Sequence, residues 1–125
     1  MKLFTQLTFF LILTSFCFAQ DFENVQVLPF EKKKDLMKYM KKTVSKSLGV
    51  KCKFCHNIKD YTDDSNPHKL VAREMMRMVI SMNTHLDSAF AAGLKAGMKH
   101  RHEPPKVECW VCHKSTTDVE FKKPD

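Results

Sequence analysis

One stretch of the chain repeats apolar residues with the period of a helix. Apolar side chains recur every four positions between residues 31 and 48: Leu36, Met40, Val44 and Leu48. Such spacing gives a helix one apolar face. Gly49 follows directly, and glycine is the commonest residue just past a helix C-terminus. We therefore predict a first helix from Glu31 to Leu48.

A second, longer stretch has the same period between residues 66 and 94. Asn66 is a favourable N-cap, and Pro67 suits the first helical position. The predicted apolar face carries six side chains: Val71, Met75, Met78, Val79, Met82 and Leu86. No segment shows the alternation of β-branched residues that favours a strand. The predicted fold class is therefore all-α, in a single domain.

The N-terminus has the pattern of a secretory signal peptide. Lys2 precedes an apolar run over residues 7–18, and Ala19 is a small residue suited to cleavage. The run is shorter than the roughly 20 residues of a membrane-spanning helix. We expect residues 1–19 to be removed, which leaves residues 20–125 as an exported domain without a transmembrane segment. A bacterial periplasm or the cell exterior is the expected location.

Four of the five cysteines lie in two CxxCH motifs, "CKFCH" at residues 52–56 and "CWVCH" at residues 109–113. Disulfides are common in small exported domains, but they do not require a histidine after each second cysteine. Zinc modules space their cysteine pairs by roughly 12–20 residues, much less than the separation here. A thioredoxin-like pair would need a βαβ setting, which this chain lacks.

CxxCH is the attachment signature of c-type haem. Each thiol adds to one vinyl group of the porphyrin, and the adjacent histidine then faces the iron. The predicted cofactors are therefore two covalently bound haems, and each would add apolar surface to a chain too small for a large core. The attachment residues are Cys52, Cys55, Cys109 and Cys112, and the axial histidines are His56 and His113.

Methionines are candidates for the opposite side of each iron. A thioether opposite a histidine raises the reduction potential of a haem, and each motif follows a helix with methionines on its predicted apolar face. Methionine is also a common core residue, so the pattern alone does not choose among them. His100 and His102 precede the second motif and compete for its iron, whereas His68 and His85 are expected at the surface.

The segments "LMKYMKKTVSKSLGVKCKFCHN" and "AREMMRMVISMN" resemble the cytochrome c subunit of photosynthetic reaction centres. The resemblance implies two helix-turn-CxxCH units in which the helix runs along the haem plane and supplies an axial methionine. It assigns Met40 to the first iron and Met78 to the second, with Met37 and Met82 as the respective alternatives. Reaction-centre members carry four haems on a membrane photosystem, and this chain has two motifs, so photosynthesis is not implied.

The expected function is electron transfer by an exported dihaem cytochrome whose irons cycle between Fe(II) and Fe(III). An iron closed by histidine and methionine has no open position for a substrate, so we expect a carrier and not an enzyme. The alternative is a haem-based sensor or small haem enzyme with an open second iron site.

The charge of the chain suggests its partner. The formal net charge is +7, and removal of Lys2 with the signal peptide leaves +6. Nucleic acid is excluded as a partner by export and by the lack of stacking aromatics among the basic residues. We expect a redox protein, acidic or membrane-bound, to dock on lysines near the first motif: Lys38, Lys41, Lys42, Lys51 and Lys53.

Overall fold

The computed structural model describes residues 22–99 and 103–120. The elements are α2 (Lys33–Tyr39), the π-helical η1 (Met40–Val44), α3 (Ser45–Leu48), the 3-10 helix η2 (Cys52–Phe54), α4 (Pro67–Lys95) and α5 (Cys109–His113). No strand occurs within these residues, which confirms the all-α prediction. The predicted signal peptide, His100 and His102 lie outside the described residues.

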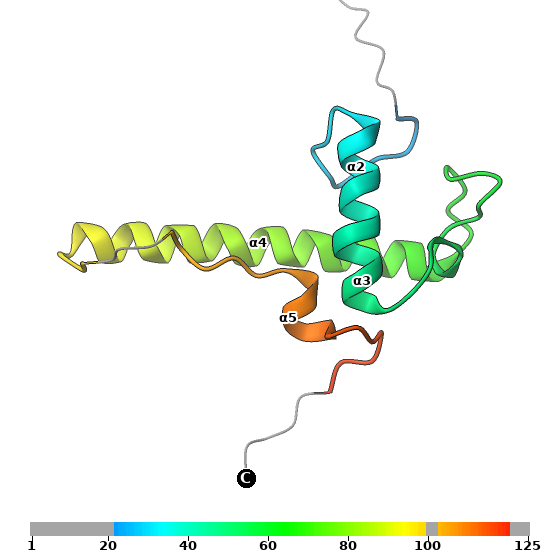
Figure 1. The fold of residues 1–125 in the computed structure, drawn as a ribbon. Coiled ribbons are helices and arrows are strands. Elements are labelled where there is room, and N and C mark those ends of the chain that lie inside the picture. The colour runs from blue at the N-terminus through cyan, green and yellow to red at the C-terminus, as the bar shows by residue number, and fades with distance from the viewer. Residues whose placement is uncertain (1–21, 100–102, 121–125) are drawn as a thin grey trace, which may run out of the picture.

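The first predicted helix is present as the continuous run of α2, η1 and α3 (Figure 1). Its N-cap is Lys32, so it begins two residues later than predicted. It ends at Gly49, whose φ of 68° is the left-handed C-cap that the sequence predicted. The predicted apolar face is confirmed, because Val44 is buried and the other three members of the stripe are half-buried.

The second predicted helix is α4, and its start is confirmed in detail. The Asn66 side chain accepts a hydrogen bond from the His68 backbone N–H at 3.0 Å, and Pro67 is the first helical residue. The predicted contact face is only partly correct. Val71, Met75, Met78 and Met82 are 41–55% exposed. Val79 and Leu86 are half-buried, as predicted, and so are Met76 and Phe90, which the predicted face did not include.

The misplaced face has a physical cause. Apolar residues occupy more than one side of α4, so a helical period fits two overlapping stripes equally well. Which stripe faces the rest of the chain depends on where α2 and α5 pack, and that is a tertiary property.

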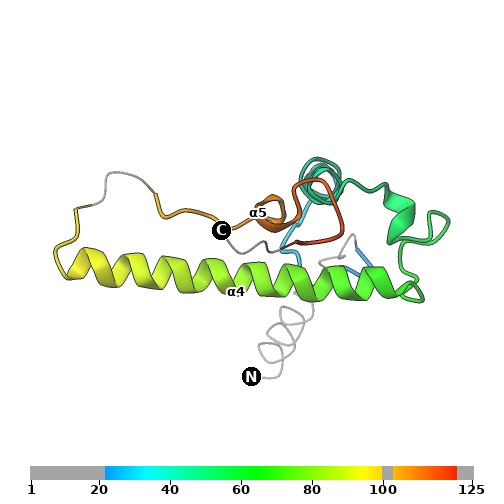
Figure 2. The ribbon, with the colours of Figure 1, turned by 90° about the horizontal axis from the view of Figure 1, so that it is seen from below.

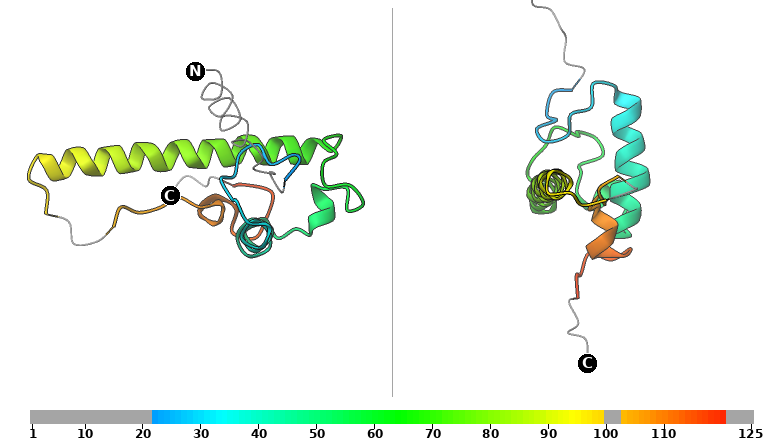
Figure 3. Two further views of the ribbon diagram at one scale, coloured as in Figure 1. Left: turned by 90° about the horizontal axis from the view of Figure 1, so that it is seen from above. Right: turned by 90° about the vertical axis from the view of Figure 1, so that its left-hand side faces the viewer.

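The helical run of α2, η1 and α3 crosses α4 near the N-terminal half of α4 (Figures 1 and 3). α5 packs against α3 and η1. Residues 103–108 return along the C-terminal half of α4 (Figure 2). The Asn83 side chain holds this segment, because its amide donates to the Val107 carbonyl at 2.9 Å and accepts from the Val107 N–H at 2.8 Å.

Candidate haem-binding sites

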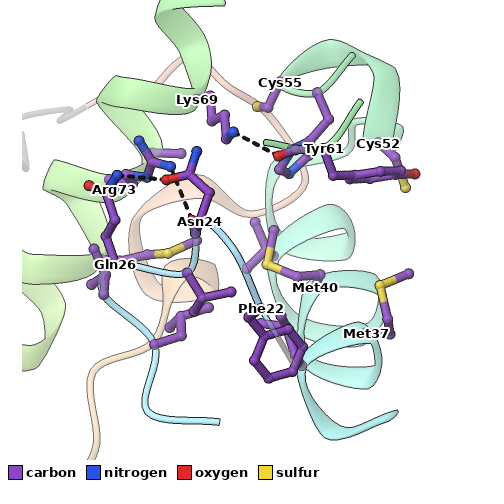
Figure 4. Close-up of a pocket in the computed structure, with 18 of the residues that line it drawn as sticks. Phe22, Asn24, Gln26, Met37, Met40, Cys52, Cys55, Tyr61, Lys69 and Arg73 are labelled. Atoms are coloured by element: carbon purple, nitrogen blue, oxygen red, sulfur yellow. Dashed lines mark hydrogen bonds between the residues drawn. The ribbon is translucent and has the colours of Figure 1, made fainter. Parts of the chain in front are cut away.

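A cavity of about 430 Å³ lies where the first helical run, the first CxxCH motif and α4 meet (Figure 4). Its volume is within the range of small-molecule and cofactor sites, roughly 300–1,000 Å³. Cys52, Cys55, His56 and Met40 all line it. Both attachment thiols and both predicted axial ligands of the first haem therefore border one cavity.

The local structure explains how Met40 and the motif come together. The π-helical turn begins at Met40, and such turns are frequent at functional sites. The left-handed turn at Gly49 then reverses the chain, so that Cys52 begins a 3-10 turn beside the helix. In Figure 4 the Met40 side chain extends from the helix toward Asn24. Met37, the alternative ligand, also lines the cavity.

His56 has the character of a ligand. Its Nδ1 atom is buried and has no hydrogen-bond partner in the described structure, and an unpaired buried nitrogen is uncommon. Burial lowers the pKa of His56, and the positive charges of Lys69 and Arg73 lower it further. The ring is therefore held as neutral imidazole, which is the form that binds metals.

An ion network centred on Asp64 supports one side of the cavity, which its two cations Lys69 and Arg73 line. Lys69 is only 6% exposed. Its ammonium donates to the Tyr61 carbonyl at 2.9 Å and the Asp63 carbonyl at 2.8 Å, and lies 2.7 Å from an Asp64 carboxylate oxygen. Hydrogen bonds from Arg73 and Lys69 hold the pKa of Asp64 well below its usual range. Asp64 therefore stays ionised and compensates both buried cations.

The chain just before α2 closes another side of the same cavity. Phe22, Asn24 and Gln26 line it (Figure 4). The Asn24 amide donates to an Asp64 carboxylate oxygen at 3.0 Å, and Arg73 donates to the Asn24 carbonyl at 3.3 Å. The ion network thus ties the chain before α2, the loop at residues 61–64 and α4 together along one side of the first site, which is partly enclosed.

The second motif forms α5, and none of its residues lines this cavity. His113 is half-buried, and its Nδ1 lies 3.0 Å from the Thr116 carbonyl. A carbonyl can only accept, so Nδ1 carries the proton and Nε2 presents its lone pair for a metal. Trp110 and Val111 are 52% and 54% exposed. The second motif therefore presents its two intervening residues to solvent, while Cys109 and Cys112 are half-buried.

Tyr39 connects the second motif to the first helical run. Burial raises the pKa of Tyr39, and the electrostatic effect of the nearby Cys109 raises it further. The Tyr39 hydroxyl therefore stays neutral beside Cys109. Cys109 therefore lies against the residue that directly precedes Met40.

The structure does not place Met78 in the first cavity. Met78 is 46% exposed on α4, and its assignment to the second iron stays a prediction. Met76 is the methionine of α4 that lines the first cavity, together with Ala72 and Arg73. Sequence reasoning missed all three. The available signal was their i, i+1, i+4 spacing along one side of the helix.

The disulfide and zinc alternatives gain no support from the described residues. Cys52, Cys55, Cys109 and Cys112 are all free. Burial raises the pKa of Cys55 and of Cys109, which favours neutral thiols over the thiolates that bind zinc. Within residues 22–99 and 103–120, no three His, Cys, Asp or Glu side chains are placed to hold a metal ion.

Residues 16–120 match the sequence family described as the photosynthetic reaction centre cytochrome C subunit. The chain belongs to this family. It is 36% identical over 90 residues to cytochrome c-554 of Chloroflexus aurantiacus, which covers 72% of this chain and 20% of that protein. It is 33% identical over 75 residues to the photosynthetic reaction center cytochrome c subunit of Thermochromatium tepidum, which covers 58% of this chain and 19% of that protein.

Membership of the family implies covalently bound c-type haem and supports an electron-carrying cytochrome. The chain spans about a fifth of the length of each of these relatives. No solved structure matches the chain. In the part of the chain that the structure describes, no helix is long and apolar enough to cross a membrane.

Proposed function

We propose that this protein is an exported dihaem c-type cytochrome that carries single electrons between redox partners. The observation that carries the proposal is the first cavity, which is lined by two attachment thiols, a neutral histidine and a methionine. These are the groups that a c-type haem with histidine and methionine ligands requires.

At the first site, Cys52 and Cys55 would hold the porphyrin through thioether bonds, with His56 and Met40 on opposite sides of the iron. The bound haem supplies the one-electron chemistry. The chain supplies enclosure, because the segment around Asn24 and the ion network restrict the access of water. A low-polarity setting with a thioether ligand favours the ferrous state.

At the second site, Cys109 and Cys112 would hold the haem, with His113 as one axial ligand and Met78 as the other. The hydrogen bond from His113 Nδ1 to the Thr116 carbonyl orients the imidazole ring. This arrangement is a carrier site as long as both axial positions are filled by side chains.

Cleavage near Ala19 and transfer to the periplasm belong to the same proposal, because haem attachment to CxxCH motifs suits an exported protein. The partner we propose is an acidic redox protein. Lys41 and Lys51 line the first cavity and are exposed, so a partner that docks there would approach the first haem.

A haem-based sensor or small haem enzyme is the second candidate, and one observation favours it. The proposed ligand Met78 is 46% exposed, so the second iron is the position more readily opened to an external ligand.

Carbon monoxide separates the two functions. The full chain, matured with both haems and reduced, should show a c-type spectrum that carbon monoxide does not change. Rapid binding of carbon monoxide to half of the haem would contradict the carrier function and support the sensor or enzyme. A matured protein without a c-type spectrum would contradict both.

A further inference from the structure

The chain after the second motif caps the helix that leads into the first motif. The Ser115 N–H donates to the Ser47 carbonyl at 2.8 Å, and the Ser115 hydroxyl donates to the Lys46 carbonyl at 3.1 Å. Both carbonyls belong to α3, the last turn of the first helical run. Carbonyls at a helix C-terminus lack partners within the helix. The Lys46 carbonyl also accepts from the Gly49 N–H at 3.4 Å, so Ser115 adds a second donor there and supplies a donor to the Ser47 carbonyl.

The contact between Ser115 and the end of α3 is so close that only glycine fits at position 49. A Cβ atom at Gly49 would overlap the Ser115 carbonyl oxygen and lie 3.0 Å from its carbonyl carbon. Gly49 also has a φ of 68°, which disfavours other residues. The junction therefore depends on the backbone of both segments as well as on one side chain.

Two residues of the same loop adopt a conformation that side chains disfavour. Lys114 and Ser115 have φ angles of 48° and 70°, in the left-handed region that residues other than glycine seldom occupy. Such conformations persist where surrounding contacts determine them. Here those contacts are the two hydrogen bonds of Ser115 to α3.

A second contact joins the two haem units nearby. Cys109 begins α5 and lies near Tyr39, and α5 as a whole packs against α3 and η1. Figure 3 shows α5 beside the end of the first helical run in both views. The second motif is thus packed against the first helical run along α5 and is held again at Ser115, just after its histidine.

We propose that Gly49 and Ser115 are positioning residues that set the distance and orientation between the two haems. Ser115 lies two residues after His113, and Gly49 lies three residues before Cys52. Displacement at this junction would move one motif relative to the other without changing the ligands of either iron. The inference rests on the proposed function, because it requires a haem at each motif.

The test compares two glycine variants of the full, matured chain. Gly49→Ala introduces strain at positive φ and a steric clash with Ser115. Gly97→Ala is the matched control, because Gly97 has a φ of 90° but its added Cβ would meet nothing within 4 Å. The readout is Soret circular dichroism, in which two neighbouring haems give a bisignate couplet that depends on their separation and relative orientation.

Gly49→Ala should lose most of the couplet while retaining both haem masses and a c-type absorption spectrum. Gly97→Ala should retain the couplet. Equal couplets in wild type and Gly49→Ala would overturn the proposal, as would equal losses in the two variants.

If Gly49→Ala does not yield protein with attached haem, a milder variant tests the same junction. Ser115→Ala keeps the backbone bond to Ser47 and removes only the hydroxyl bond to Lys46. Its couplet should weaken, and its residue-115 amide should exchange with solvent roughly fivefold faster, the factor for one net hydrogen bond. Unchanged values of both would overturn the proposal.

The number of attached haems distinguishes a failure of this inference from a failure of the proposed function on which it rests. Fewer than two attached haems in the wild type would contradict the dihaem cytochrome itself. Two attached haems with a couplet that neither variant changes would contradict only the role of the junction.

Discussion

The two CxxCH motifs share a spacing but have different surroundings. The first borders a cavity of about 430 Å³ that is partly enclosed by the chain before α2, the first helical run and α4. The second lies on α5, where Trp110 and Val111 are more than half exposed. His56 Nδ1 is buried without a partner, whereas His113 Nδ1 is paired with the Thr116 carbonyl.

The difference shows that a motif specifies attachment, while the surrounding chain specifies the properties of the bound group. Enclosure disfavours the more highly charged ferric state, whereas a carbonyl partner makes a histidine a stronger electron donor to iron and favours that state. We therefore expect the first haem to have the higher reduction potential.

Met40→Ala should have the largest effect on this contrast, because it removes the sulfur ligand from the enclosed site. The first ferric haem should lose its sulfur-to-iron charge-transfer band, its potential should fall toward that of the second, and its ferrous form should bind carbon monoxide. Absorption spectroscopy and redox titration measure all three. Met37→Ala is the matched control, since Met37 lines the same cavity. If Met37→Ala removes the band and Met40→Ala does not, the assignment is wrong.

Met78→Ala should have a similar but smaller effect at the second haem, because Met78 is already 46% exposed. We expect loss of its charge-transfer band and faster carbon monoxide binding, followed by stopped-flow absorption. Met75→Ala is the control, being 45% exposed against 46% for Met78. An unchanged spectrum in Met78→Ala, with an altered one in His102→Ala, would instead establish a bis-histidine site with a potential below the first.

Asn83→Ala should destabilise the packing of residues 103–108, which lead into the second motif, and leave the first site intact. The substitution removes both hydrogen bonds to Val107, so about 1–3 kcal/mol of unfolding free energy should be lost. Denaturant titration measures it. Thr84→Ala on the same helix removes one exposed bond to the Ile80 carbonyl and should cost less than about 0.5 kcal/mol. Equal losses in the two variants would contradict a clamping role for Asn83.

Substitution of the docking lysines should produce the smallest effect. It should lower electron transfer through the first haem more than through the second. Lys41 and Lys53 are exposed near the first motif, and their attraction for an acidic partner is screened over a Debye length of about 8 Å at physiological salt. The double variant Lys41→Gln and Lys53→Gln should lower the bimolecular electron-transfer rate and weaken its salt dependence in stopped-flow experiments. Lys95→Gln, at the far end of α4, is the control. A salt-independent wild-type rate would leave these lysines without a docking role.

Local sequence signals predicted the helices well. The C-cap at Gly49 and the N-cap at Asn66 are confirmed, because capping depends on the conformational preferences of single residues. The membership of the family is also confirmed. The π-helical turn at Met40 was not predicted, since no residue type specifies one.

Contacts between distant segments could not be read from the sequence. Met76 and Arg73 line the first cavity because α4 presents that side to the first helical run, which no helical period determines. The Ser115 junction with α3 spans most of the described chain, and neither segment carries a motif for it. The axial roles of Met40 and Met78 remain predictions.

Denaturing mass spectrometry of the matured protein tests the central claim most directly. The account predicts a chain cleaved near Gln20 that carries two haem masses, one on each CxxCH motif. Replacing Cys52 with serine should weaken attachment only at the first motif, and replacing Cys109 only at the second. A mass with one haem, or with none, would contradict the dihaem cytochrome.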